Sequence, residues 1–142
     1  MISTRMLMKF ILSFHVVAAD DPPPDELRAS FSEVMPGAVT FEPAFGEVRA
    51  WEGWAKARSG ERERQGYVFL TSDFPPEEIG YSGPIEVLVG MDTEGVLTGV
   101  KVLSYYESYR SIRGDFLSTE QFQPQFRGKS VTDGFEVGRD ID

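Results

Sequence analysis

The stretch IEVLVGM-DTEG-VLTGVKVL, residues 85–103, decides the fold of this 142-residue chain. Two apolar runs rich in β-branched residues, 85–91 and 96–103, flank a short connection in which Asp92 and Gly95 suit a tight reversal. The pattern predicts a β-hairpin. The run GYVFLTS at residues 66–72 has a similar aromatic and β-branched character, so an antiparallel sheet of at least three strands is expected.

One helix is predicted before the sheet, over residues 25–35. Leu27, Phe31, Val34 and Met35 fall on one stripe at helical spacing, and acidic residues occupy the first turn, where the helix dipole favours them. A Pro-Gly pair then ends the helix. The expected fold class is therefore α+β: a small antiparallel β-sheet with a central hairpin, packed by one or more helices.

The remaining segments give weaker patterns. Residues 39–48 are strand-like, with Phe41 and Phe45 expected to be buried. Residues 51–64 are charged and mixed, and the polar run at 60–65 is typical of a turn. Further along, an amphipathic stretch indicates a broken helix or two turns, and the last residues form a loop; these are residues 116–126 and 131–142.

The first nineteen residues have the pattern of a secretory signal peptide. Arg5 and Lys9 precede a short apolar run, residues 10–19, that ends in small side chains. The run is too short to span a bilayer, which takes about 20 apolar residues. An N-terminal helix and a misassigned start codon are the alternatives. The expected organisation is a signal peptide at 1–19, a helix and strand extension at 20–65 and a main domain at 66–142.

Composition excludes several function classes. With 23 acidic and 14 basic residues, the net charge of −9 repels nucleic acid, whose phosphates need clustered Lys and Arg. The absence of Cys excludes disulfides, thiol nucleophiles and iron–sulfur ligation within this chain. The single histidine, His15, lies in the leader, so neither a histidine metal site nor a catalytic triad is expected.

Two polar and aromatic segments border the predicted hairpin. A Gly- and Pro-containing loop, residues 80–84, opens it, and tyrosines, hydroxyls and arginines follow its second strand at residues 105–113. Flavin mononucleotide (FMN) needs such groups: a flat or apolar wall, polar contacts for the ring edge and donors for the phosphate. The alternative is structural, because strand-end tyrosines often pack at a rim and arginines are often solvated. Glu107 and Asp115 lack the spacing of an acid–base pair, and no G-x-G-x-x-G motif opens a helix.

The quoted runs resemble a known family. GYVFLTSD at residues 66–73 and GYSGPIEVLVGMD at residues 80–92 are similar to the flavin-binding domain of NosR-type proteins, which serve nitrous oxide respiration. The same core is similar to the flavin subunits of the Rnf and Nqr electron-transport complexes. The resemblance covers roughly residues 66–142, and in these proteins a Glu-Ser or Glu-Thr segment also frames the flavin. It implies an α+β domain in the periplasm that holds FMN and exchanges electrons with membrane-bound partners.

The resemblance defines the expected site. Its cofactor is FMN, bound by an electron-transfer module rather than a stand-alone enzyme. The threonine that carries FMN in this family stands in a Ser/Thr-Gly-Ala-Thr motif beyond a segment like residues 137–142, and this chain lacks it, so covalent attachment is not expected here. The alternative is a non-catalytic extracytoplasmic interaction module that has lost its flavin. The expected cofactor-binding residues are Tyr81, Ser82, Gly83, Pro84, Tyr106, Glu107, Ser108, Arg110 and Ser111.

Overall fold

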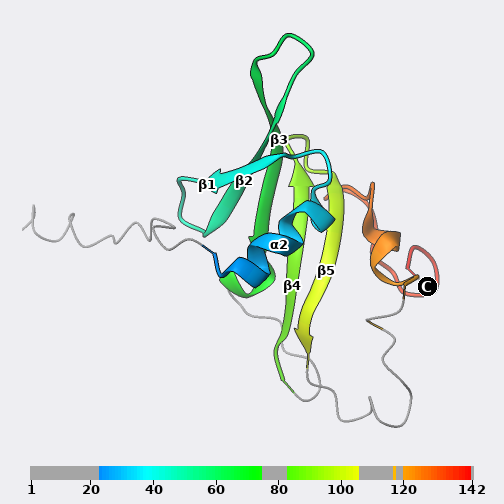
Figure 1. The fold of residues 1–142 in the computed structure, drawn as a ribbon. Helices are drawn as coiled ribbons and strands as arrows, with labels where there is room; N and C mark the ends of the chain where they lie inside the picture. Colours follow the sequence, from blue (N-terminus) through cyan, green and yellow to red (C-terminus); the bar gives the residue numbers. More distant parts are fainter. Residues whose placement is uncertain (1–22, 75–82, 106–116, 118–119, 142) are drawn as a thin grey trace, which may run out of the picture.

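The computed structural model describes residues 23–74, 83–105, 117 and 120–141. Its centre is a five-stranded antiparallel sheet of order β1-β2-β3-β4-β5, so strands that follow one another in the sequence are also neighbours in space. Helix α2 crosses one face of this sheet (Figure 1). This arrangement confirms the predicted α+β class. The bounds are α2 Asp25–Val34, β1 Thr40–Pro43, β2 Ala50–Lys56, β3 Arg62–Leu70, β4 Ile85–Asp92 and β5 Leu97–Tyr105, with short 3-10 helices η1 at Thr71–Asp73 and η3 at Gln123–Phe126.

The core lies between α2 and the sheet. Phe31 is fully buried and its ring contacts the rings of Phe41 and Trp51, with centroid separations of 5.2 and 4.9 Å. Because register partners share a face of an antiparallel sheet, Trp51, Val68 and their neighbours along the row all face the helix. The predicted helical stripe is confirmed. The core cluster comprises Phe31, Val34, Met35, Ala38, Trp51, Val68, Leu70 and Leu88, with Leu27, Phe41 and Leu103 packed against it.

The last turn of α2 sits directly on sheet backbone, at two glycines. Gly90 and Gly99 are register partners on β4 and β5. A Cβ on Gly90 would lie 2.3 Å from the carbonyl oxygen of Val34, and a Cβ on Gly99 would lie 2.9 Å from the same atom. That carbonyl accepts a hydrogen bond of 2.6 Å from the Thr98 hydroxyl, which satisfies one of the carbonyls left without a partner at a helix end.

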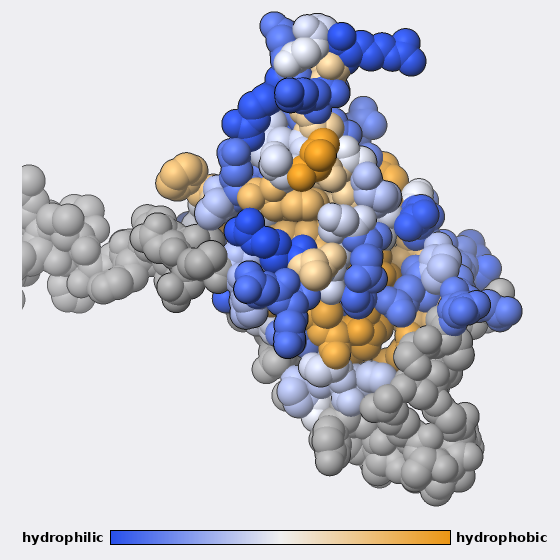
Figure 2. Space-filling view, viewed as in Figure 1, coloured by the Kyte–Doolittle hydropathy of each residue, from blue (hydrophilic) through white to orange (hydrophobic). Residues whose placement is uncertain are grey.

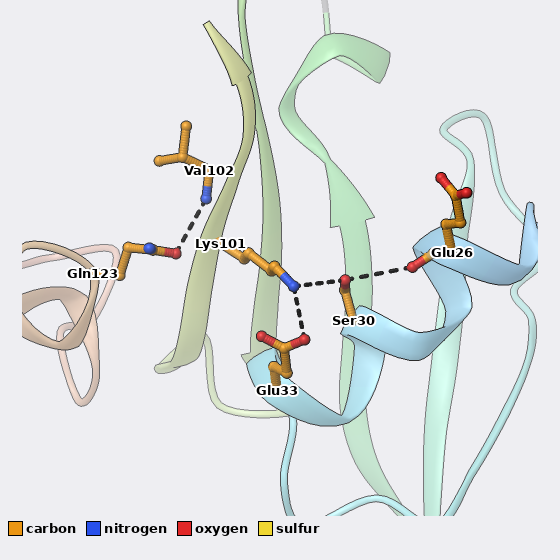
Figure 3. A network of polar contacts seen from close by, with 6 residues as sticks. All are labelled: Glu26, Ser30, Glu33, Lys101, Val102 and Gln123. Carbon is orange, nitrogen blue, oxygen red and sulfur yellow. Dashed lines mark hydrogen bonds and ion pairs between the residues drawn. The ribbon is translucent and has the colours of Figure 1, made fainter. Parts of the chain in front are cut away.

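A polar contact joins α2 to β5. Lys101 donates to the hydroxyl of Ser30 at 2.9 Å and to the carboxylate of Glu33 at 2.7 Å, as Figure 3 shows. The Ser30 hydroxyl in turn lies 3.5 Å from the carbonyl oxygen of Glu26. The aliphatic stem of Lys101 therefore covers the sheet beside the helix while its ammonium group reaches polar partners.

The structure corrects the interpretation of the charged segment at residues 51–64. Most of it is strand, in β2 and the first part of β3, and the polar run at 60–65 belongs mainly to β3. Charged side chains point away from the core, where Arg64 pairs with Glu52 at 2.9 Å and Arg62 pairs with Glu42 at 2.7 Å. In Figure 2 the protruding tip of this hairpin is largely hydrophilic. The predicted domain division at residue 65 falls within β3 and stays a prediction.

The prediction for residues 39–48 was only partly right. The strand β1 covers Thr40–Pro43, and Phe41 packs against the core. Phe45, which was expected to be buried, is 96% exposed. The strand ends at Pro43, and the chain then turns before β2, with Ala44 donating its N–H to the carbonyl of Ala50 at 2.9 Å. Phe45 therefore lies on this connection and not on the core side of a strand.

The C-terminal segment follows the outer edge of β5 (Figure 1). Leu97 donates its N–H to the carbonyl of Lys129 and accepts one from Gly128, each at 2.8 Å, and Val102 donates to the side-chain oxygen of Gln123 at 3.2 Å. The described part of residues 116–126 includes the short helix η3, which fits the expectation of turns. Within the described residues, no helix is long and apolar enough to cross a membrane.

Candidate functional site

The two segments predicted to form the site meet the sheet at one end. Ile85, the first residue of β4, is the register partner of Tyr105, the last residue of β5. Gly83 and Pro84 therefore enter the hairpin beside the point where the chain leaves it. The other expected site residues lie outside the described residues: Tyr81, Ser82, Tyr106, Glu107, Ser108, Arg110 and Ser111.

The turn η1 borders the same end of the sheet. The Thr71 hydroxyl accepts a 3.0 Å hydrogen bond from the backbone N–H of Val87, and the Ser72 hydroxyl donates to the Glu86 carboxylate at 3.0 Å. Both bonds join the turn to the first half of β4, close in sequence to Gly83 and Pro84. The turn thus continues the β3–β4 contact beyond the last register pair of these strands.

An ion pair fixes η1 from its other side. Arg49, just before β2, contacts both carboxylate oxygens of Asp73, with Nε–Oδ2 3.0 Å and a terminal nitrogen–Oδ1 distance of 3.1 Å. The guanidinium also lies 5.7 Å from the centre of the Trp51 ring. A bidentate pair constrains orientation as well as distance. Arg49 and Asp73 therefore set the position at which the chain leaves η1.

The sheet face opposite α2 is apolar near this end. Phe69 is the register partner of Val89, Val89 pairs with Val100, and Val87 pairs with Val102. These five side chains alternate with the core residues, so they point to the face without α2. In the described part of the chain, no α-helix covers that face. The result is an apolar row beside Gly83 and Pro84, in which Val89 is buried and the other four side chains are partly exposed.

A separate hollow of about 630 Å³ lies at the opposite end of the sheet, between β1 and the β2–β3 hairpin. Arg62 stacks over Trp54 there, 4.5 Å from the ring centre. The buried indole N–H of Trp54 has no hydrogen-bond partner within the described part of the chain. None of the predicted site residues lines this hollow. Its lining residues are Gly37, Val39, Thr40, Glu42, Trp54, Ala55, Lys56 and Arg62.

Comparison with known families gives a match, which includes the end of the sheet bordered by Gly83, Pro84 and Tyr105. Residues 80–140 match the FMN-binding domain family. No curated protein matches the chain. The FMN-binding match starts at residue 80, includes the whole β4–β5 hairpin and ends just before Ile141. It supports a flavin-binding module and FMN as the cofactor that the sequence predicted.

The described groups near this end are suited to part of an FMN molecule. The apolar rows on the outer face could lie against the flat face of the isoalloxazine ring. Arg110 and Ser111, two of the expected cofactor-binding residues, are outside the described residues. No group of His, Asp or Glu residues in the described ranges could hold a metal ion.

Sequence reasoning missed the residues that the rest of the sheet brings to this end. Arg49, Phe69, Asp73 and Phe74 all precede the segment that matches the FMN-binding domain. Only their place in the fold groups them, because β3 pairs with β4 and η1 is hydrogen-bonded to it. The sequence contains one signal for them: residues 69–73 are part of the GYVFLTSD stretch that resembles the NosR-type flavin domain.

Proposed function

We propose that this chain is an FMN-binding electron-transfer module. FMN sits at the end of the sheet where Gly83 and Pro84 enter β4 and where β5 ends at Tyr105. The proposal rests on the FMN-binding domain match at residues 80–140, which spans this hairpin. The register of the hairpin pairs Ile85 with Tyr105, so the two segments of the expected site adjoin the same end of the sheet. FMN supplies one- and two-electron redox chemistry when bound.

In this proposal the protein binds and positions the flavin. The apolar rows at Phe69, Val87 and Val102 exclude water from one side of the ring. No described residue at this end is proposed as an acid or base. The role fits an electron relay rather than a stand-alone enzyme.

We further propose that the module belongs to a NosR-like respiratory flavoprotein associated with a membrane and exported to the periplasm. The support is the resemblance of residues 66–92 and the signal-like pattern of residues 1–19. Fractionation of cells that express the full chain tests the export: recovery in the periplasmic fraction with a shortened N-terminus supports it, and recovery of the uncut chain in the cytoplasm overturns it.

Titration with FMN tests the central proposal directly. The full chain is added to a fixed amount of FMN while flavin fluorescence and the visible absorption bands are followed. Saturable quenching with a shift of the bands is expected, because a ring moved from water to an apolar wall changes both. A subsequent dithionite titration should give a midpoint potential different from that of free FMN. Unchanged fluorescence and spectrum at high protein concentration would overturn the proposal.

The second candidate is an interaction module of the same fold without flavin. The hollow beside Trp54 favours it, because a concave and mainly apolar surface of this size lies away from the proposed FMN end. A chain that binds no FMN but recovers a defined protein partner, and loses it when Trp54 is replaced, would support this candidate.

A further inference from the structure

Phe74 is the described aromatic side chain nearest in sequence to the proposed FMN site on its β3 side. It follows η1 directly, and its backbone N–H donates to the carbonyl of Thr71 at 3.1 Å. Its ring meets the ring of Phe69 edge to face, with centroids 5.0 Å apart and an interplanar angle of 63°. Even so, 42% of Phe74 remains exposed. A large aromatic ring thus has one side packed and another side open.

Contact with Phe69 decides which face of the sheet Phe74 occupies. Val68 and Leu70, the neighbours of Phe69 on β3, belong to the core beneath α2. Phe69 therefore points to the opposite face, in the row it shares with Val89 and Val100. Phe74 extends this apolar surface toward the end of the sheet.

The turn η1 places Phe74 close to the entrance of β4. Thr71 is bonded to Val87 and Ser72 to Glu86, so the turn advances along β4 toward Gly83 and Pro84 as it approaches Phe74. The bidentate pair between Arg49 and Asp73 fixes the residue immediately before Phe74. The backbone that leads into Phe74 is therefore held at three consecutive residues, which favours a defined ring position.

We propose that Phe74, braced by Phe69, forms a wall of the flavin site and contacts the isoalloxazine ring. The inference rests on the proposed FMN-binding function and assigns a ring contact to a residue outside the segment that matches the family. The exposed side of the Phe74 ring would contact the flat conjugated ring of the ligand. Ring contact and the removal of water from both surfaces would stabilise the complex. Phe74 would contact only the isoalloxazine ring, which FMN and riboflavin share, so it should contribute equally to the binding of both.

The chain contains a matched control for this residue. Phe45 is also an exposed phenylalanine, 96% accessible, but it lies on the β1–β2 connection. The variants Phe74→Ala and Phe45→Ala remove the same atoms from the two places. A third variant, Phe74→Tyr, keeps the ring. Far-UV circular dichroism and a urea midpoint for each variant establish that the fold is retained.

Each variant is titrated with FMN and, separately, with riboflavin, which has the same ring and no phosphate. Phe74→Ala should raise the dissociation constants of both ligands by about tenfold and reduce the shift of the visible bands, as expected for loss of an aromatic contact. Phe45→Ala and Phe74→Tyr should each remain within about twofold of the unchanged chain.

The outcomes separate the inference from the function on which it rests. If the unchanged chain binds FMN and Phe74→Ala binds both ligands as tightly, the wall is refuted and the FMN-binding function stands. Weakening of FMN alone would also refute it, because the effect would then act through the phosphate. If the unchanged chain binds neither ligand, both proposals fall.

Discussion

Replacing Gly90 with alanine tests how closely α2 approaches the sheet. A Cβ at this position would lie 2.3 Å from the carbonyl oxygen of Val34 and 2.6 Å from the Thr98 hydroxyl. The first of these atoms belongs to backbone, so no side-chain rotation relieves the contact. Gly90 is not among the described glycines with positive φ, so the expected effect comes from crowding and not from the backbone conformation of alanine.

The expected free-energy change is the difference between a gain and two losses. Alanine restricts the unfolded chain and contributes about 0.4–1 kcal/mol of stability. Overpacking against a fixed element costs about 1–3 kcal/mol. If the end of α2 moves outward, the hydrogen bond from Thr98 to Val34 is lost as well, at about 1 kcal/mol. Gly90→Ala should therefore lower the free energy of unfolding by about 2 kcal/mol.

Urea denaturation followed by circular dichroism measures this change. With a slope of about 2 kcal/mol per molar urea, the midpoint should fall by about 1 M. Gly46→Ala is the control, because the nearest atoms to a Cβ there are 3.9 Å away. That variant should be as stable as the unchanged chain or slightly more so. Equal midpoints for the two variants would refute the tight contact between helix and sheet.

Three further predictions concern the core, the site and acid stability. Phe31→Ala removes the fully buried ring at the centre of the core and should lower the free energy of unfolding by about 3–5 kcal/mol in urea titrations. Arg49→Gln should change the free energy of unfolding by less than about 1 kcal/mol, because the Arg49 side chain is 40% exposed, but it should weaken FMN binding. Arg62→Gln is the control and should leave FMN binding unchanged. Equal effects of the two variants in FMN titrations would argue against the role of Arg49. The backbone N–H of Ser130, 2.6 Å from the Asp133 carboxylate, lowers the pKa of Asp133. This carboxylate therefore stabilises the fold above about pH 4 and loses that effect as the pH falls through its lowered pKa. NMR titration should find the titration midpoint of Asp133 below that of an unfolded aspartate.

Local sequence patterns predicted the helix and the hairpin, because the pattern of each lies within one continuous segment of the chain. The stripe containing Phe31 and Val34 repeats at helical spacing, and the hairpin at residues 85–103 has two apolar runs joined by a turn. Both elements are present at nearly the expected residues. Such patterns are informative because the periodicity itself records which side chains face the core.

Strand β2 and the start of β3 could not be recognised in this way. Their outward side chains are charged and are satisfied across the sheet, as Arg64 is by Glu52, so charges occur in runs that resemble a loop. Their inward positions include Gly53, which lies under Met35 and contributes no hydrophobic signal. Cross-strand pairing, which a linear pattern does not contain, defines these strands.

The candidate site divides in the same way. Gly83 and Pro84 could be selected because they adjoin an evident hairpin, and the register of Ile85 with Tyr105 puts the neighbouring segment beside them. Phe74 and Arg49 could not be selected, because they reach this end only through the pairing of β3 and η1 with β4. Residues that depend on long-range pairing need the structure before a role can be assigned.

The hydrogen-bonded pairing of β3 with β4 decides which part of this chain could be transferred between proteins as one folding unit. Of the eight residues in the described core cluster, only Leu88 lies within residues 80–140. A gene fragment limited to that segment would encode β4, β5 and the C-terminal segment without α2 and without the other three strands of the sheet, and a two-stranded hairpin alone is marginal in water. Recombination that transfers this module intact must therefore carry the earlier strands and α2 as well, so the inherited unit is larger than the segment by which the family is recognised.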